Sequence, residues 1–374
     1  MKKGFTLIEL LAVIVILAII ALIAVPIVLN IIEETRENSN LRSAEMYLDA
    51  VEIAIVRKLI DGGVPNGTYN ILENGNICLE YTDDKCTNEL KVEVDGQTPT
   101  AGSTITISNG KITNTSLLLN NKTVVKNEKG ELIYIPTPKS FAEDSWETII
   151  ANVKAGNLSA YKVGDTKEIA LTGFTNKETD SNGLYTIRIA NTSTPSECST
   201  EGYSQTACGF VIEFEDIIIR HKMNETNTNV GGYPASSMYA YIQNDIYNAL
   251  PEELKAVIIP TYVVSGHGNT SGEENFITEQ DKLYLLSAKE VYGSDSFDTS
   301  SGLTRQLDYY SNIGVTASSY SGAIKKLDGT ANYWWLRSAS SNFTDTFRGV
   351  INYGGVYYDD ANYSSGVAVA FRIG

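Results

Sequence analysis

Histidine and cysteine, on which most metal centres and many catalytic centres depend, are scarce in this chain. Its 374 residues include two histidines and four cysteines. The sequence has no C-x-x-C pair and no H-E-x-x-H, G-x-S-x-G or P-loop phrase. Zinc centres, zinc proteases, serine hydrolases and phosphate-binding loops are therefore not indicated. We expect a protein without enzymatic activity, cofactor or bound metal.

Basic residues are also few. There are 29 Lys and Arg against 45 Asp and Glu, so the formal net charge is 29 − 45 = −16. Such a chain repels a phosphate backbone, and direct nucleic-acid binding is not expected. Hydrophobic residues make up 43% of the chain, which is enough to bury cores and excludes bulk disorder. At roughly 150 residues per domain, the length predicts two to three domains.

Charged residues are absent from Leu10 to Ile32, a run of 23 positions. A helix of this length crosses a bilayer. A secretory signal peptide is the alternative, but the run is too long for its apolar region and no small-x-small cleavage site follows. Glu9 lies at the start of this apolar segment, where an ionisable side chain is costly and needs a partner.

The chain begins MKKGFTLIELL, and this phrase resembles the processing motif of type IV pilins and pseudopilins. The resemblance implies that a prepilin peptidase removes residues 1–4 by cutting after Gly4, and that Phe5 is then N-methylated. It also implies that Glu9 pairs with the terminal amine of a neighbouring pilin subunit. Such a protein lies in the bacterial cytoplasmic membrane before assembly and in a surface pilus afterwards. A plain N-terminal membrane anchor is the alternative.

Apolar residues continue beyond the membrane segment at steps of three and four, which indicates one face of an amphipathic helix. They are Leu41, Ala44, Leu48, Val51 and Ile55. We expect one helix over residues 5–61, with residues 5–32 in the membrane or in a filament core. Pro26 is expected to kink it, because proline removes a helical hydrogen bond. The glycines and the proline that follow Asp61 end it.

Residues 62–135 are predicted to form a small β-rich, pilin-like head. Apolar runs flank Asn109-Gly110, a dipeptide typical of hairpin turns. Residues 136–140 contain two prolines and are expected to form a stiff linker, because proline cannot join a β-ladder. Residues 141–374 then form a further domain, which contains all three tryptophans.

The four cysteines form two close pairs, Cys78 with Cys86 and Cys198 with Cys208, each across a short polar loop. An exported chain meets an oxidising compartment, so we predict two local disulfides with this pairing. Free thiols are the alternative.

Five phrases within residues 141–374 resemble one family when they are taken together. They are Tyr161–Thr166, Gly231–Tyr233, Leu283–Glu290, Tyr333–Ser338 and Gly366–Phe371. The set is similar to bacterial C-type-lectin-like domains marked by a WWLRS phrase, which are relatives of the formylglycine-generating-enzyme fold. One departure is Ala368-Val369, where many relatives carry Arg-Pro. The two resemblances together imply an α+β chain: a long pilin helix, a β-rich head and a lectin-like ligand-binding domain.

Trp334, Trp335 and Arg337 lie in the WWLRS phrase itself. Two large aromatic rings and a guanidinium suit core packing around a buried, charge-assisted hydrogen bond. We therefore expect these three residues in the domain core, with ligand contact as the alternative.

Residues 340–365 lack lysine, glutamate, glutamine, methionine and tryptophan altogether. They are instead rich in tyrosine, asparagine, serine, aspartate and glycine, the mixture that antibody paratopes use. This composition predicts a ligand-binding surface. Its candidate residues are Asn342, Phe343, Asp345, Asn352, Tyr353, Tyr357, Tyr358, Asn362 and Tyr363.

Two further interpretations of this segment stay open. Every residue type in it can be written with a codon that ends in a pyrimidine, as a diversity-generating retroelement would leave it. A turn-rich β segment with few long side chains is the alternative. Asp359-Asp360 is a candidate for Ca²⁺ binding, although a solvated acidic turn explains the pair as well.

The preferred function is a minor or tip subunit of a type IV pilus that displays a lectin-fold domain for adhesion to an external protein or glycan. The alternative is a pseudopilin of a type II secretion or DNA-uptake machine. A membrane-tethered enzyme is the weakest hypothesis, because no catalytic phrase supports it.

Overall fold

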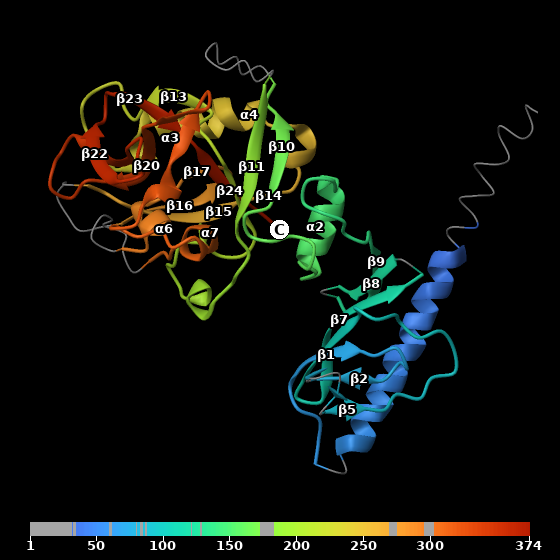
Figure 1. The fold of residues 1–374 in the computed structure, drawn as a ribbon. Helices are drawn as coiled ribbons and strands as arrows, with labels where there is room; N and C mark the ends of the chain where they lie inside the picture. Colours follow the sequence, from blue (N-terminus) through green and yellow to red (C-terminus); the bar gives the residue numbers. More distant parts are fainter. Residues whose placement is uncertain are drawn as a thin grey trace, which may run out of the picture. The chain divides into compact units, whose positions relative to one another are not determined.

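The computed structural model describes residues 32, 35–59, 62–79, 81–82, 85–86, 88–120, 122–127, 129–172, 183–268, 275–294 and 303–374. The predicted processing and assembly residues Gly4, Phe5, Glu9 and Pro26 lie outside this part of the chain. No helix of the described residues is long and apolar enough to cross a membrane. The chain divides into two compact units, Met1–Thr137 and Pro138–Gly374 (Figure 1).

The first unit is a helix packed against an antiparallel sheet. The helix covers residues 35–59, and the sheet has the order β5-β2-β1-β6-β7-β8-β9. The strands are β1 (Gly67–Ile71), β2 (Ile77–Cys78), β5 (Glu89–Leu90), β6 (Thr104–Ser108), β7 (Lys111–Leu119), β8 (Lys122–Lys126) and β9 (Leu132–Ile135). The two-residue strands β3 (Tyr81–Thr82) and β4 (Lys85–Cys86) pair with each other and form a separate hairpin.

The predicted amphipathic stripe forms the core of this unit. Ala44, Val51 and Ile55 are buried in one cluster with strand residues such as Ile105 and Leu117. At the turn between β6 and β7, Asn109 and Gly110 have φ of 51° and 71°. Both angles are positive, as the tight hairpin turn expected for Asn-Gly requires.

The second unit contains two larger sheets. The first has the order β10-β11-β12-β24-β14, with β17 also paired to β24, and the second has the order β13-β23-β20-β21-β22. The strands of the first are β10 (Thr166–Ala170), β11 (Leu184–Asn191), β12 (Val211–Phe214), β14 (Ile258–Ile259), β17 (Tyr284–Leu285) and β24 (Val369–Ile373). The strands of the second are β13 (Ile219–Lys222), β20 (Trp334–Ala339), β21 (Thr346–Val350), β22 (Val356–Asp360) and β23 (Ser364–Val367).

Short hairpins and helices complete this unit. The hairpins are β15 (Thr261–Gly266) with β16 (Asn275–Asp281) and β18 (Lys325–Leu327) with β19 (Thr330–Asn332). The α-helices are α2 (Trp146–Lys154), α3 (Ser237–Tyr241), α4 (Tyr247–Ala249), α5 (Glu252–Lys255), α6 (Ala288–Tyr292) and α7 (Asp308–Asn312). Single turns are η1 (Ser196–Ser199), η2 (Tyr233–Ala235), η3 (Ile242–Ile246) and η5 (Ser321–Ala323), of which η3 is π-helical.

The mixture of helices and strands confirms the α+β class, and both predicted disulfides are present. Cys78 is bonded to Cys86, and Cys198 is bonded to Cys208. Residues 237–249 are helical throughout, from α3 through the π-helical turn η3 to α4, and the helix ends before Pro251.

Candidate ligand-binding surface

The predicted ligand-binding segment forms the outer part of the second sheet. Strand β20 pairs with β21, Trp334 opposite Val350 and Trp335 opposite Gly349. Strand β21 pairs in turn with the edge strand β22, Arg348 opposite Tyr358. Side chains alternate between the two faces of a strand, so this register decides which tyrosines share a face with the core.

The structure places Trp334, Trp335 and Arg337 in the interior. All three are fully buried. The Trp334 Nε1–H donates to the Ala323 carbonyl at 3.1 Å, and the Trp335 Nε1–H donates to the His221 carbonyl at 2.9 Å. Buried indole groups usually need such a partner, and these two bonds hold β20, the strand that pairs with β21.

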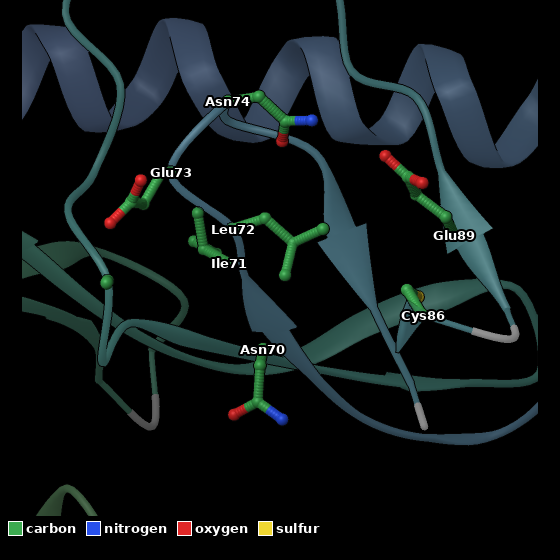
Figure 2. A pocket seen from close by; sticks show the side chains of 8 residues that line it. Asn70, Ile71, Leu72, Glu73, Asn74, Cys86 and Glu89 are labelled. Carbon is green, nitrogen blue, oxygen red and sulfur yellow. The ribbon is translucent and has the colours of Figure 1, made fainter. Parts of the chain in front are cut away.

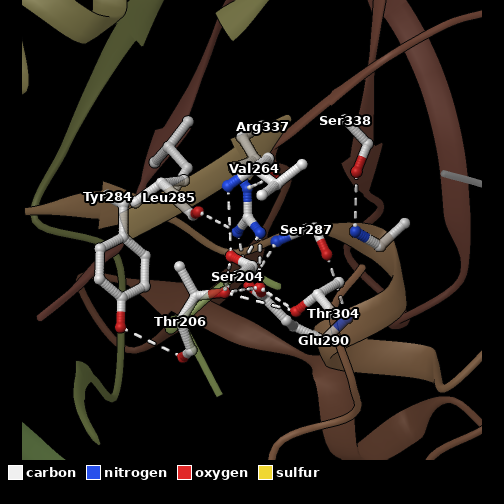
Figure 3. Close-up of polar contacts among 12 residues, drawn as sticks. Ser204, Thr206, Val264, Tyr284, Leu285, Ser287, Glu290, Thr304, Arg337 and Ser338 are labelled. Carbon is white, nitrogen blue, oxygen red and sulfur yellow. Dashed lines mark hydrogen bonds and ion pairs between the residues drawn. The ribbon is translucent and has the colours of Figure 1, made fainter. Parts of the chain in front are cut away.

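Arg337 forms a bidentate ion pair with Glu290 of α6, and neither side chain is exposed to solvent. Figure 3 shows the hydroxyls of Thr206 and Thr304 converging on the same carboxylate, to which both donate. The Arg337 guanidinium also donates to the Leu285 carbonyl at 2.9 Å. The charges are thus paired and hydrogen-bonded, as a buried ion pair must be to be tolerated.

Five exposed aromatic side chains lie on β22, in the turns on either side of it, in the loop before β21 and immediately before β20. They are Tyr333, Phe343, Tyr353, Tyr358 and Tyr363, which we call the aromatic surface. Tyr353 is 58% exposed and Tyr363 is 56% exposed. The rings of Phe343 and Tyr358 are in contact, with centroids 4.9 Å apart. Contiguous exposed apolar patches often mark interaction sites, and Phe343 with Tyr358 forms such a contiguous pair.

The other predicted ligand-binding residues differ in their exposure. Asn342 and Asn352 are exposed, whereas Asp345 and Asn362 are half-buried. The Asp345 carboxylate accepts from the Asn227 amide at 3.4 Å, so part of its hydrogen-bonding capacity is already used. The structure therefore brings most, but not all, of the predicted side chains to the surface.

Tyr357, a further predicted ligand-binding residue, is not fully exposed to solvent. It is half-buried, and its hydroxyl donates to the Asp359 carboxylate at 2.7 Å. Burial raises the pKa of Tyr357, and the neighbouring Asp359 carboxylate raises it further. Asp359 in turn accepts from the Asp360 N–H at 3.0 Å. Tyr357 and Asp359 thus support the edge strand, and the exposed ring beside them is Tyr358.

Sequence reasoning missed Asn229, which holds the loop that carries Phe343. Its side-chain amide nitrogen lies within hydrogen-bond distance of the carbonyls of Ser340, Phe343 and Thr346, at 3.1, 2.7 and 3.0 Å. Its backbone N–H donates to the Thr344 carbonyl at 2.8 Å. Asn229 is fully buried, and no pattern of spacing in the sequence distinguishes it from other asparagines.

The free edge of β22 offers little backbone for a ligand. The N–H of Ala361 donates to the Asp345 carbonyl, and the N–H of Ile351 donates to the Gly355 carbonyl. The alternation of an antiparallel pair then directs the backbone groups of Val356, Tyr358 and Asp360 outward. Those of Asp360 are engaged by Asp359 and by the N–H of Tyr363. A ligand here is therefore bound mainly by side chains.

The first unit has a pocket of its own, about 700 Å³ in volume. Figure 2 shows Glu73 and Glu89 on opposite sides of it, with Leu72 between them and Cys86 of the disulfide at its wall. The Glu89 carboxylate accepts from the Asn76 amide at 2.6 Å.

No group of three or more histidine, cysteine, aspartate or glutamate side chains that suits a metal occurs among the described residues of either unit.

His221 is one of the two histidines of the chain. It lies within β13, is half-buried, and its ring stacks on Tyr241 with centroids 4.1 Å apart. The reason is that α3, which ends at Tyr241, packs over this strand.

Two sequence-family models match the chain. One is described as a prokaryotic N-terminal methylation motif and matches residues 1–25. The other is described as a domain of unknown function (DUF6273) and matches residues 211–374. Neither the search of curated proteins nor the search of solved structures gives a match.

The first match supports a type IV pilin-like or pseudopilin subunit. It implies processing by a prepilin peptidase and assembly with other pilins, and it fits a membrane-anchored precursor and a surface pilus. The second match covers all five residues of the aromatic surface but assigns no activity to them.

Proposed function

We propose that this protein is a minor or tip subunit of a type IV pilus, and that its C-terminal, lectin-like domain binds an external protein or glycan. The observation that carries the binding role is the aromatic surface, in which the ring of Tyr358 on β22 and four rings in loops of the same sheet are exposed, while Arg337 of the neighbouring strand β20 is buried in an ion pair. Rigid aromatic rings beside small polar groups are typical of recognition surfaces. The domain acts by binding and not by catalysis.

The polymerising role is assigned to the N-terminal helix. Besides its buried stripe, the helix exposes Met46, Ile53 and Val56. These positions differ by seven and three residues, so they share one face of the helix. Apolar side chains exposed on a helix face in this way favour contact with a neighbouring helix, as assembly with other pilins requires.

The test is binding by the full chain in detergent micelles to glycan and protein arrays. The variant Tyr353→Ala/Tyr358→Ala/Tyr363→Ala should lose tenfold or more in affinity, since aromatic anchors each contribute about 1–2 kcal/mol or more at such interfaces. Leu184→Ala is the matched control, because Leu184 is comparably exposed on a different sheet. Full binding by the triple variant would refute the assignment.

Diversification of residues 340–365 by a retroelement is a further part of this proposal. Within the segment, Phe347, Val350 and Ala361 are buried while the tyrosine rings of the aromatic surface are exposed. A segment can vary its surface residues and keep its core residues constant only if surface and core positions are separate in this way. A near-copy template repeat and a reverse-transcriptase gene beside this gene would support the idea, and their absence would end it.

A pseudopilin of a secretion or DNA-uptake machine is the second candidate, because the same N-terminal motif serves both classes. Neighbouring genes distinguish them. The net charge of −16 disfavours direct capture of DNA by this subunit.

A further inference from the structure

A second recognition feature lies far along the chain from the aromatic surface. A groove of about 1120 Å³ in the C-terminal unit is lined by residues of α2, β10 and α5 and of the segments that flank α5. Its apolar lining includes Trp146, Ile150, Ile169 and Val257. Trp146 and Ile169 are buried beneath the surface, and Ile150 and Val257 are half-buried. The groove therefore has an apolar floor.

Strand β10 forms one wall of the groove and is also the edge of its sheet. It pairs with β11, and no strand of the described residues pairs with its other side. The Ile189 N–H donates to the Asp165 carbonyl, and the Leu171 N–H donates to the Gly183 carbonyl. By the alternation of an antiparallel ladder, the backbone N–H and C=O groups of the residues between them point outward at every second position.

The residues whose backbone groups point outward are Thr166, Glu168 and Ala170. All three are exposed. They present donors and acceptors at a spacing that fits an added β-strand. At β22, by contrast, the groups of Asp360 are already occupied, so β10 is the more open of these two edges.

The groove is strongly acidic. Its exposed glutamates are Glu143, Glu147, Glu168, Glu252 and Glu253. The basic residue in the lining is Lys167, and its Nζ donates to the carbonyls of Ala142 and Asp144 at 3.0 and 2.8 Å. Glu252 pairs with Lys255 at 2.6 Å. The other four glutamates give the groove a negative charge that favours a cationic partner.

We propose that this groove binds an extended polypeptide segment with alternating basic and apolar residues, which adds as a strand to the free edge of β10. The backbone of the segment pairs with Thr166, Glu168 and Ala170. Its apolar side chains cover the floor at Trp146 and Ile169, and its basic side chains meet the glutamates. This interaction is independent of the aromatic surface.

The test uses the full chain in detergent and a fluorescein-labelled heptapeptide of alternating lysine and valine, with affinity measured by fluorescence anisotropy. A second peptide carries N-methyl groups on alternate backbone amides, which removes strand donors but keeps the charge. We expect the N-methylated peptide to bind at least about tenfold more weakly, since several backbone hydrogen bonds are lost. Binding of the first peptide should weaken with added salt.

Two variants locate the site. Ala170→Pro removes one outward N–H at an edge position where proline is tolerated, and we expect about three- to tenfold weaker binding. Ala170→Ser keeps the N–H and should bind like the native chain. Equal binding of both peptides, or no effect of Ala170→Pro, would overturn the proposal. It would also be overturned if sedimentation shows a self-association that Ala170→Pro abolishes and the peptide does not displace, because the occupant is then a second copy of the chain.

Discussion

At the residue scale, a second buried charge cluster complements the pair of Arg337 and Glu290. Glu213 accepts from Arg188, from the Tyr310 hydroxyl and from the Lys325 ammonium, the last two at 2.9 Å. The Lys325 ammonium lies 5.2 Å from the centre of the Trp334 ring. Although burial opposes ionisation of Glu213, Arg188 and Lys325 together lower its pKa. The cluster joins β12, β11 and β18, and Lys325 links it to Trp334 at the start of β20.

Lys325 makes the stability of the C-terminal unit depend on pH. Burial lowers the pKa of Lys325 to about 8, although Glu213 opposes the shift. An unfolded lysine has a pKa of about 10.4, so between these values the unfolded chain binds more protons than the folded chain. The free energy of unfolding should therefore rise with pH in this window, by about 3 kcal/mol across all of it, relative to the variant Lys325→Met.

Urea titration followed by tryptophan fluorescence measures this difference, because all three tryptophans lie in the C-terminal unit. The quantity to compare is the change in the free energy of unfolding between about pH 8 and pH 10. A difference between native protein and variant that stays flat, or that falls as the pH rises, would contradict the prediction.

The burial of a residue could be predicted from sequence where its side-chain chemistry alone requires it. The residues that it would contact could not be predicted. Two tryptophans and an arginine in one short phrase indicate a core, because rings and an interior guanidinium need burial and a partner together. The partner, Glu290, is 47 residues away in the chain, and only the packing of α6 against β20 brings it there. Asn229 escaped prediction for the same reason, since its three acceptors are more than 100 residues away.

At the scale of elements, the loop before β21 is held by hydrogen bonds from Asn229, a residue outside the loop. The side chain of Asn229 reaches the carbonyls of Ser340, Phe343 and Thr346. Loops that are not tied down by such contacts open readily. Asn229 is therefore a positioning residue for Phe343, because it binds the backbone carbonyl of Phe343 and not the ring.

We predict that Asn229→Asp loosens this loop, because a carboxylate cannot donate to the three carbonyls. The loss should destabilise the C-terminal unit by about 1–3 kcal/mol. It should also increase amide hydrogen exchange over residues 341–345 more than in β24. Asn244→Asp is the control, since the Asn244 amide bonds only within its own helix, to the Ala240 carbonyl. Equal protection of the loop in Asn229→Asp and native protein would exclude this role.

Element types were more predictable than their ends and pairing. The stripe of the helix over 35–59 and the Asn109-Gly110 turn follow from local periodicity and backbone geometry. The π-helical turn η3 does not, because an extra residue in a helical turn depends on tertiary contacts. Nor could the sequence reveal that β20 lies beside β23 in parallel through Trp334 and Gly366, since that pairing joins strands that are not neighbours in a hairpin.

At the scale of the whole molecule, the two units have separate hydrophobic cores. One core contains the buried stripe of the helix over 35–59, and the others contain residues from 141 onward. Each unit also has one disulfide that closes a short loop within it, Cys78–Cys86 in the first and Cys198–Cys208 in the second. Cores and cross-links that do not cross the boundary allow the units to unfold separately.

Removing one disulfide at a time should therefore destabilise one unit at a time. A cross-link that closes a loop of this length stabilises by about 2–3 kcal/mol through the entropy of the unfolded chain. In Cys198→Ser/Cys208→Ser the tryptophan fluorescence transition should move to lower urea, because that signal comes from the second unit alone. In Cys78→Ser/Cys86→Ser the fluorescence transition should stay in place, while part of the far-ultraviolet circular dichroism change moves to lower urea. Each variant serves as the control for the other. If either pair of substitutions shifts both signals together, the two units unfold as one cooperative body, and binding at the C-terminal unit then also depends on the disulfide of the first.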